Sequence, residues 1–240
     1  MSIDTSKFKK AAADYAVQFV TSGMVVGLGH GSTAIFSSHR IATLLECGEL
    51  SDIRGIPCSM HVEREAREMG IPLTTLDEHP VIDVTIDGAD EVTERCEVIK
   101  GGGGALLREK MVAQASRREI IVVDESKLSP LLGTHWSVPL EVIPFGWRVH
   151  LHFFESMGAH PNIRKDGRGN KYITDQGNYI IDCFFGTIKE PEKLAAMLSA
   201  RSGIVEHGLF LGLATDVIVA GEAGIRHITA GSDGGAVATT

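Results

Sequence analysis

The sequence predicts an α/β fold in which a Rossmann-like parallel sheet domain carries an inserted ferredoxin-like α+β lid domain. Two observations lead to this prediction. Through residue 134, short apolar segments of strand length alternate with amphipathic helical segments, a pattern typical of a parallel sheet with crossover helices. From about residue 135 the order changes to β-α-β-β-α-β, the order of a split ferredoxin-like unit. The 240 residues, 43% of them hydrophobic, suffice for one large domain and one smaller one.

The first domain is expected to begin with an amphipathic helix, because Phe8, Ala12, Tyr15 and Phe19 recur at helical spacing. Strand and helix segments then alternate, separated by glycines or turn residues. We expect strands over 24–28, 53–58, 71–74, 81–86, 96–100 and 120–123, and helices following the turn at 29–33, over 61–69 and from 105. Two further strands, over 216–219 and 225–228, are expected to return to this domain.

The second domain is predicted from a change of pattern after His135. Turn residues at 165–167 and 175–178 mark its hairpins. We expect strands over 137–142, 160–165, 179–185 and 203–210, and helices over 145–157 and 191–200. The division is therefore 1–134 plus 211–230 for the main domain and 135–210 for a lid or interface domain. The small-residue tail, 231–240, is expected to be disordered.

Composition excludes several classes of protein. The net charge of -8 and pI near 5.7 argue against a nucleic-acid-binding surface. No apolar run reaches the ~20 residues of a membrane span, and the N-terminal segment has no apolar signal core. The four cysteines contain no C-x-x-C pair, which argues against a zinc ribbon or a redox dithiol. We therefore expect a soluble cytoplasmic protein with reduced thiols.

The segment from Lys100 to Lys110 contains the most informative motif, four consecutive glycines between a predicted strand and a predicted helix. Without Cβ atoms, the backbone of Gly101–Gly104 can bring its N–H groups close to a ligand. The helix that follows begins with unpaired N–H donors and a partial positive charge. A flexible linker is the alternative interpretation, but the flanking strand and helix argue against it. We therefore expect an anion or oxyanion site with Glu109 beside it.

A second glycine-rich turn, Gly27-Leu-Gly-His-Gly-Ser-Thr33, joins a strand to a helix, as phosphate-binding turns do. A dinucleotide fingerprint is not indicated, because Ser32 stands where the third glycine belongs and no carboxylate ends the second strand. Hydroxyls at Ser32 and Thr33 suit a monophosphate better. A plain tight turn remains the structural alternative.

Carboxylates and lysines also follow other predicted strands, at Asp87-Gly-Ala-Asp90-Glu91 and Asp124-Glu-Ser-Lys127. The carboxyl ends of parallel strands meet at one edge of a sheet, where ligands usually bind. The acidic cluster alone is also compatible with a solvated turn or a helix cap. No His or Cys cluster has the spacing of metal ligands, so no metal site is predicted.

Taken together, Gly27–Ala34, Asp87–Glu91, Lys100–Lys110 and Asp124-x-Ser-Lys127 resemble the type A ribose-5-phosphate isomerases in order and spacing across nearly the whole chain. The resemblance implies interconversion of ribose 5-phosphate and ribulose 5-phosphate in the non-oxidative pentose phosphate pathway, without metal or cofactor, by a homodimer or homotetramer. One departure is His30, at a position where the family commonly has Thr.

The resemblance and the residues together suggest roles in the site. Glu109 is the candidate base that moves a proton between C2 and C1, and Lys100 with the N–H groups of Gly101, Gly102 and Gly103 would stabilise the enediolate oxygens. Asp87 would open the sugar ring and Asp90 would hold hydroxyls. The other predicted binding residues are Lys9, His30, Gly31, Ser32, Thr33 and Lys127 around the phosphate, and Gly88 and Ala89 between the two aspartates.

Two alternative functions fit parts of this pattern. A sugar-phosphate deaminase or hydrolase of similar topology would use the same phosphate turn, but we would expect a His close to its carboxylates. A non-catalytic sugar-phosphate sensor would normally carry a DNA-binding helix-turn-helix before the sugar-binding domain. Neither feature is recognisable in the sequence.

Overall fold

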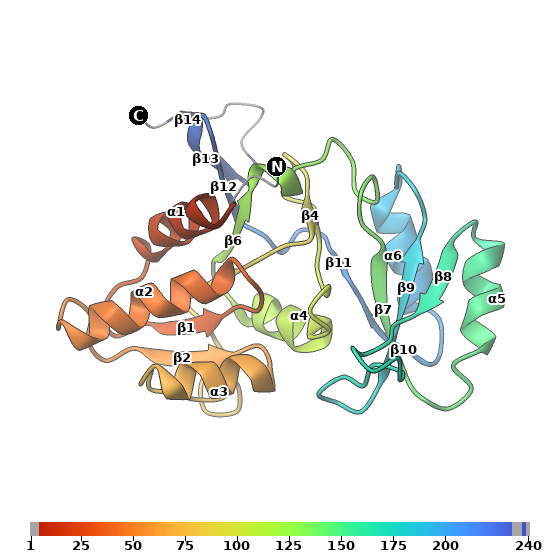
Figure 1. Cartoon of the computed structure of the whole chain (residues 1–240), viewed down its shortest axis with the longest axis horizontal. Helices are drawn as coiled ribbons and strands as arrows, with labels where there is room; N and C mark the ends of the chain where they lie inside the picture. The colour runs from red at the N-terminus through yellow and green to blue at the C-terminus, as the bar shows by residue number, and fades with distance from the viewer. Residues whose placement is uncertain (1–4, 232–236, 239–240) are drawn as a thin grey trace.

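A seven-stranded, mainly parallel sheet forms the centre of the computed structural model, which describes residues 5–231 and 237–238 (Figure 1). Its order is β14-β13-β12-β6-β3-β1-β2, and the five strands from β12 to β2 run parallel. The strands are β1 (Val25–Leu28), β2 (Arg54–Pro57), β3 (Val84–Asp87), β6 (Glu119–Asp124), β12 (Asp216–Gly221), β13 (Gly224–Thr229) and β14 (Val237–Ala238). This sheet confirms the predicted α/β class.

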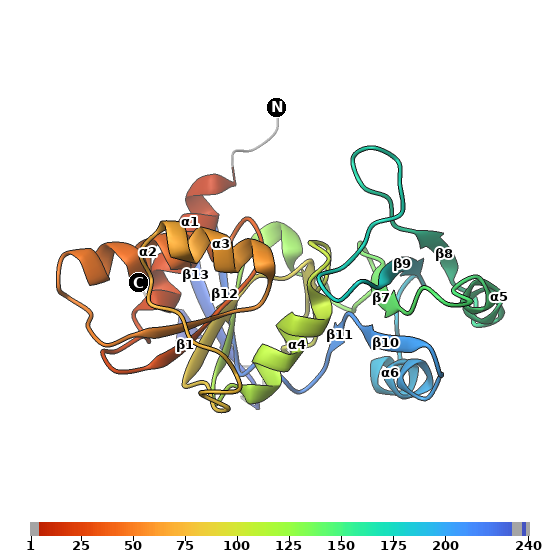
Figure 2. The same cartoon turned by 90° about the horizontal axis from the view of Figure 1, so that it is seen from below.

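Four helices accompany the sheet: α1 (Ser6–Val17), α2 (Ala34–Glu46), α3 (Met60–Glu68) and α4 (Leu106–Ala115). Helices α1 and α2 lie side by side, and α4 lies between this sheet and the second one (Figures 1 and 2). The small, fully buried Ala12 and Ala16 let α1 pack closely in a core that includes Val26 and Ile120. Because α4 lies between the two sheets, both can contact it.

The second sheet is antiparallel, with order β10-β7-β9-β8, and confirms the predicted β-α-β-β-α-β series. Its elements are β7 (Val138–Val142), α5 (Val149–Ser156), β8 (His160–Ile163), β9 (Tyr179–Phe184), α6 (Pro191–Ser199) and β10 (Ile204–His207). Phe154 of α5 and Leu198 of α6 share one apolar cluster with Leu140 and Ile181 of the sheet. This unit lies beside the seven-stranded sheet (Figure 2).

A small third sheet, β11-β5-β4, was not predicted. It consists of β4 (Glu91–Val92), β5 (Val98–Ile99) and β11 (Leu209–Phe210), all antiparallel. The strand predicted over 96–100 is therefore shorter and belongs to this hairpin, because the chain reverses at Cys96, whose φ is 59°. The strand predicted over 203–210 is divided at Gly208, where a side chain would collide with the carbonyl of Lys100.

Three further predictions need correction. The strand predicted over 71–74 is only an isolated bridge between Leu73 and Gly55. The helix predicted from 145 begins at Val149, after a turn. Within the tail predicted to be disordered, residues 237–238 pair with β13, whereas 232–236 and 239–240 lie outside the described residues. None of the helices in the described ranges has the length and apolar character needed to cross a bilayer.

Candidate active site

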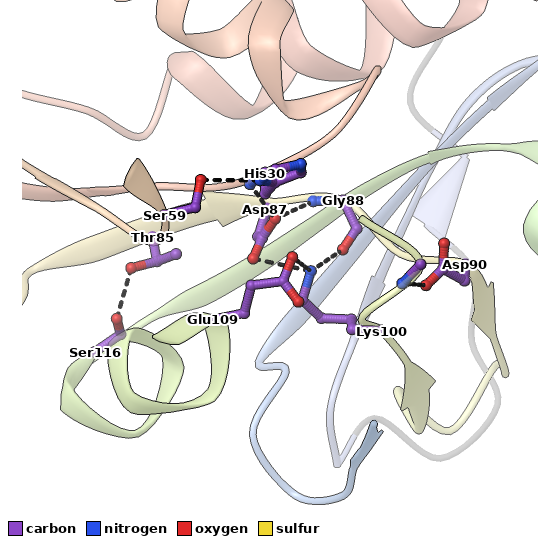
Figure 3. A network of polar contacts seen from close by, with 10 residues as sticks. His30, Ser59, Thr85, Asp87, Gly88, Asp90, Lys100, Glu109 and Ser116 are labelled. Atoms are coloured by element: carbon purple, nitrogen blue, oxygen red, sulfur yellow. Dashed lines mark hydrogen bonds and ion pairs between the residues drawn. The ribbon is translucent and has the colours of Figure 1, made fainter. Parts of the chain in front are cut away.

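The carboxyl ends of β1 and β3 and the loop after β5 bring the predicted motifs together around Asp87 (Figure 3). Asp87 is the last residue of β3, and its Oδ1 accepts hydrogen bonds from the backbone N–H groups of His30 at 2.9 Å and Gly88 at 2.7 Å. Gly29 is required here, since a Cβ would collide with Asp87. The turn after β1 is therefore fixed against the end of β3.

Lys100 lies at the centre of a buried charge cluster. Its Nζ is 2.9 Å from Asp87 Oδ2 and 3.4 Å from Glu109 Oε1, and it donates to the Gly88 carbonyl at 2.6 Å. Burial alone would lower the pKa of this ammonium, but the negative charges of Asp87 and Glu109 outweigh that effect and raise it. Lys100 therefore remains a cation.

Glu109 lies in the first turn of α4 and is only 3% exposed. Its Oε2 has no hydrogen-bond partner among the described residues. Burial raises the pKa of Glu109 to about 8, although the nearby Lys100 acts in the opposite direction. At the far end of α4, a 2.7 Å contact between the hydroxyls of Thr85 and Ser116 ties the helix to β3. The site thus holds a basic carboxylate in a fixed position.

A cavity beside this cluster contains nearly the whole predicted set of residues. Its lining includes His30, Gly31, Ser32, Thr33, Gly88, Ala89, Asp90, Lys100, Gly101, Gly102, Gly103, Glu109 and Lys127. Two predicted residues do not line it. Lys9 contacts a lining residue, because its Nζ donates a hydrogen bond to Ser32 Oγ at 2.9 Å. Asp87 lies behind Lys100, with both its oxygens engaged.

The two glycine-rich segments both line this cavity. At the start of α2, the N–H groups of Ile35 and Phe36 already donate to the carbonyls of Gly31 and Thr33. No acceptor among the described residues takes the N–H groups of Ser32, Thr33 and Ala34, so these remain available to an anion. In the second segment, Gly102 donates from its N–H to Asp90 Oδ2 at 2.7 Å. A Cβ on Gly102 would collide with Asp90, and one on Gly103 with the His30 ring. Glycine is therefore needed at both positions, because the backbone approaches the Asp90 and His30 side chains too closely for a Cβ.

The His30 ring lies between the glycine loop and α3. Its Nδ1 is 2.9 Å from Ser59 Oγ, and Ser59 caps α3 by accepting from Val62 N. Burial lowers the pKa of His30, although Asp87 raises it. A His close to the carboxylates, the feature expected of a deaminase or hydrolase, was not recognisable in the sequence but is present in the fold. His30 lines the same cavity as Asp90 and Glu109, and its backbone N–H donates to Asp87.

Cys58 is a buried neighbour of the site that sequence reasoning missed. Its Sγ and the carboxylates of Asp87 and Glu109 place ligand atoms within 4.8 Å of one another, although no cluster of metal ligands was predicted. The Lys100 ammonium contacts both carboxylates, and burial keeps the Cys58 pKa well above its usual value. A thiol that stays protonated beside a resident cation is poorly suited to holding a metal. The sequence could have indicated Cys58 through its position directly after β2, at the same edge of the sheet as the other site residues.

Comparisons with known proteins agree with this geometry. Residues 54–224 match the family described as ribose 5-phosphate isomerase A (phosphoriboisomerase A). A ribose-5-phosphate isomerase A from Chloroflexus aurantiacus is 56% identical over 237 residues, covering 99% of this chain and 98% of the relative. A solved D-ribose-5-phosphate isomerase in complex with phospho-erythronic acid aligns with a TM-score of 0.91 and 37% identity, covering 93% of this chain and 98% of the other. The enzyme from Plasmodium falciparum aligns with a TM-score of 0.90 and 38% identity, at 93% and 98% coverage. The chain therefore belongs to the ribose 5-phosphate isomerase A family.

Proposed function

We propose that this cavity interconverts D-ribose 5-phosphate and D-ribulose 5-phosphate through an enediolate, with Glu109 as the base. The observation that carries the proposal is the Glu109 carboxylate, buried at the cavity wall 3.4 Å from a permanent ammonium. Glu109 takes the proton from C2 of the open aldose and returns it to C1. The hydroxyl proton of O2 passes to O1, so that O1 ends as a hydroxyl and O2 as the carbonyl oxygen. Lys100 and the N–H groups of the glycine loop stabilise the negative charge that develops on these oxygens.

Ring opening is assigned to Asp90 rather than to Asp87. Both oxygens of Asp87 are already engaged, by two backbone N–H groups and by Lys100, so its role is to orient the ammonium. Asp90 lines the cavity, and burial raises its pKa although the Gly102 N–H acts in the opposite direction. A carboxyl with a raised pKa is a better proton donor to the ring oxygen near neutral pH.

The phosphate is assigned to the turn at Gly31, Ser32 and Thr33. The N–H groups of Ser32, Thr33 and Ala34, which no acceptor among the described residues takes, and the two hydroxyls suit a dianion. Lys9 donates to Ser32 of this turn, and Lys127, which also lines the cavity, contributes positive charge. The Lys127 Nζ lies 4.7 Å from the centroid of the Trp136 ring. Binding of this remote group helps to position the reacting carbons.

The assay that tests the function also tests the absence of a metal. Ribose 5-phosphate is mixed with the protein after exhaustive dialysis against EDTA, and ribulose 5-phosphate is measured. We expect full turnover, because Lys100 already occupies the cationic position between the carboxylates. Turnover that disappears on chelation and returns with a divalent ion would contradict this mechanism. The deaminase, hydrolase and sensor alternatives predict no ribulose 5-phosphate at all, and family membership does not favour them.

His30→Thr tests whether the ring contributes to phosphate binding. The bound dianion raises the pKa of the imidazole, which burial lowers in the free protein. The protonated ring binds the dianion more tightly, so the KM of the wild type should rise as pH increases from below 6.5. We expect His30→Thr to flatten this dependence and to leave turnover at saturation nearly unchanged. The phosphate of the substrate titrates near pH 6 in both proteins, so the comparison isolates the ring. Identical KM profiles would show that the ring serves only packing.

The assembly and cellular context are proposed from the same family. We propose a catalytic unit of 1–134 plus 211–230, covered by 135–210 as lid or subunit interface, in a homodimer or homotetramer. Light scattering of the full chain distinguishes these sizes. The net charge of -8 favours a small-molecule substrate over nucleic acid, and the four free cysteines fit a reducing compartment such as the cytoplasm.

A further inference from the structure

The glycine loop is held from behind by two side chains of the second α+β unit, neither of which was predicted from the sequence. Arg164 Nη1 donates to the carbonyls of Gly101 at 2.8 Å and Gly102 at 3.1 Å. Tyr172 Oη donates to the carbonyl of Gly103 at 3.3 Å. Three successive carbonyls of the loop therefore face the second unit, away from the cavity that the same glycines line.

Arg164 is itself fixed in place. Its Nε donates to Asp182 Oδ2 at 2.9 Å, and its Nη2 donates to Asp182 Oδ1, so the carboxylate holds one edge of the planar guanidinium. Asp182 lies in β9, and Arg164 follows β8, its neighbour in the antiparallel sheet. The Arg164 side chain is only 14% exposed. A rigid fork held along one edge presents its remaining nitrogen in a fixed direction.

The fixed carbonyls determine where the loop N–H groups point. In a planar trans peptide the carbonyl and the N–H point in opposite directions. The peptide between Gly101 and Gly102 contains the Gly101 carbonyl and the Gly102 N–H, and this N–H donates to Asp90. The next peptide, whose Gly102 carbonyl is held by Arg164, carries the N–H of Gly103. No protein acceptor among the described residues takes this N–H, and Gly103 lines the cavity.

We propose that Arg164, held by Asp182, is a positioning residue that keeps the Gly103 N–H directed at the enediolate oxygen. This inference rests on the proposed isomerase function. Glycine peptides rotate easily, because no Cβ restricts them. The bond from the Gly104 N–H to the Gly101 carbonyl at 3.0 Å closes the turn but does not hold the peptide between Gly102 and Gly103, so this peptide needs an external restraint to stay preorganised. Arg164 provides that restraint without touching the substrate, and it connects the second unit to the chemistry of the first.

The central test is Arg164→Met, which keeps the bulk of the side chain and removes its donors. Loss of one oxyanion donor typically costs 100- to 1,000-fold in kcat, so misdirecting one is expected to cost on the order of 10- to 100-fold. Phospho-erythronic acid, whose carboxylate presents two oxygens where the enediolate has its own, should bind more weakly by a similar factor. Inorganic phosphate, which the proposed function assigns to the turn at Gly31, Ser32 and Thr33, should inhibit both proteins equally.

Three variants complete the test. Arg164→Lys should recover part of the lost kcat, because one ammonium can still reach a carbonyl. Asp182→Asn should lower kcat in the same direction by loosening the guanidinium, and it decides the question if Arg164→Met does not fold. Arg201→Met is the matched control, since this arginine also bonds to a carbonyl, that of Val149, but within the second unit and away from the loop. We expect wild-type turnover from it.

The outcomes separate this inference from the proposed function. A wild-type protein that forms no ribulose 5-phosphate would refute the proposed function. An active wild type whose folded Arg164 or Asp182 variants keep their kcat would refute the positioning role alone. Equal losses of affinity for phospho-erythronic acid and for inorganic phosphate would also refute it, because they would indicate a general collapse of the cavity.

Discussion

Glu109→Gln is expected to reduce turnover of ribose 5-phosphate by at least ~100-fold, as loss of a general base does, while changing KM by less than about threefold. Glutamine has the shape of glutamate but cannot accept the C2 proton. The variant should fold. Burial raises the pKa of Glu109 to about 8 because it destabilises the charged carboxylate, and the neutral glutamine does not carry that cost. A variant that retains more than a tenth of wild-type turnover would exclude Glu109 as the base.

Stability measurements distinguish loss of the base from loss of the fold. The folded pKa of Glu109 lies above its unfolded value, so its contribution to stability is fully present below about 4.5 and is lost as pH rises through about 8. Glutamine does not titrate. Glu109→Gln should therefore be at least as stable as the wild type in urea unfolding at pH 9. Glu119→Gln is the matched control, because Glu119 is equally buried and its pKa is raised by burial, but it does not line the cavity.

The same pKa predicts the pH dependence of the wild-type reaction. Only ionised Glu109 can take the C2 proton, so kcat/KM should fall as pH decreases below about 8, approaching tenfold per pH unit. The profile belongs to the free enzyme and reports the buried cluster as a whole, because Lys100 and Asp87 both influence Glu109. A profile that is flat between pH 6 and 8 would contradict the assignment.

The sequence predicts those site residues whose positions are determined by the ends of the parallel strands. Asp87 ends β3 and the turn before Ser32 follows β1, and the ends of parallel strands meet at one edge of the sheet whatever the details of packing. Lys100 was placed near them for a partly wrong reason, because β5 belongs to a separate antiparallel hairpin. The hairpin depends on a local reversal at Cys96 and on pairing with β11, more than a hundred residues later.

The contacts that sequence reasoning missed have no periodic signature. Arg164 reaches Gly101 across 63 residues of chain, and Asp175 accepts from the Met60 N–H at 2.8 Å across 115. Such contacts depend on how the two sheets dock, which alternation of apolar residues does not specify. The division of roles between Asp87 and Asp90 likewise depends on which oxygens are already occupied, a property of the folded chain alone.

Lys100→Met is expected to abolish turnover and to lower the free energy of unfolding by about 3–5 kcal/mol at pH 9, since it leaves buried carboxylates without their cation. Asp87 and Glu109 are 1% and 3% exposed, so water cannot replace the ammonium. The loss should be smaller at pH 5, because Glu109, whose raised pKa rises further without Lys100, is then neutral. Urea unfolding at the two pH values measures the difference.

Two further variants identify the cause of that loss. The double variant Lys100→Met/Glu109→Gln should recover part of the stability at pH 9, because one of the two unpaired carboxylates is gone, and should recover no activity. Lys110→Met should lose stability but keep turnover, since this buried lysine bonds to Glu206 at 2.7 Å and does not line the cavity. A Lys100→Met variant as stable as the wild type at pH 9 would contradict the role of Lys100 as the cation that compensates these buried carboxylates.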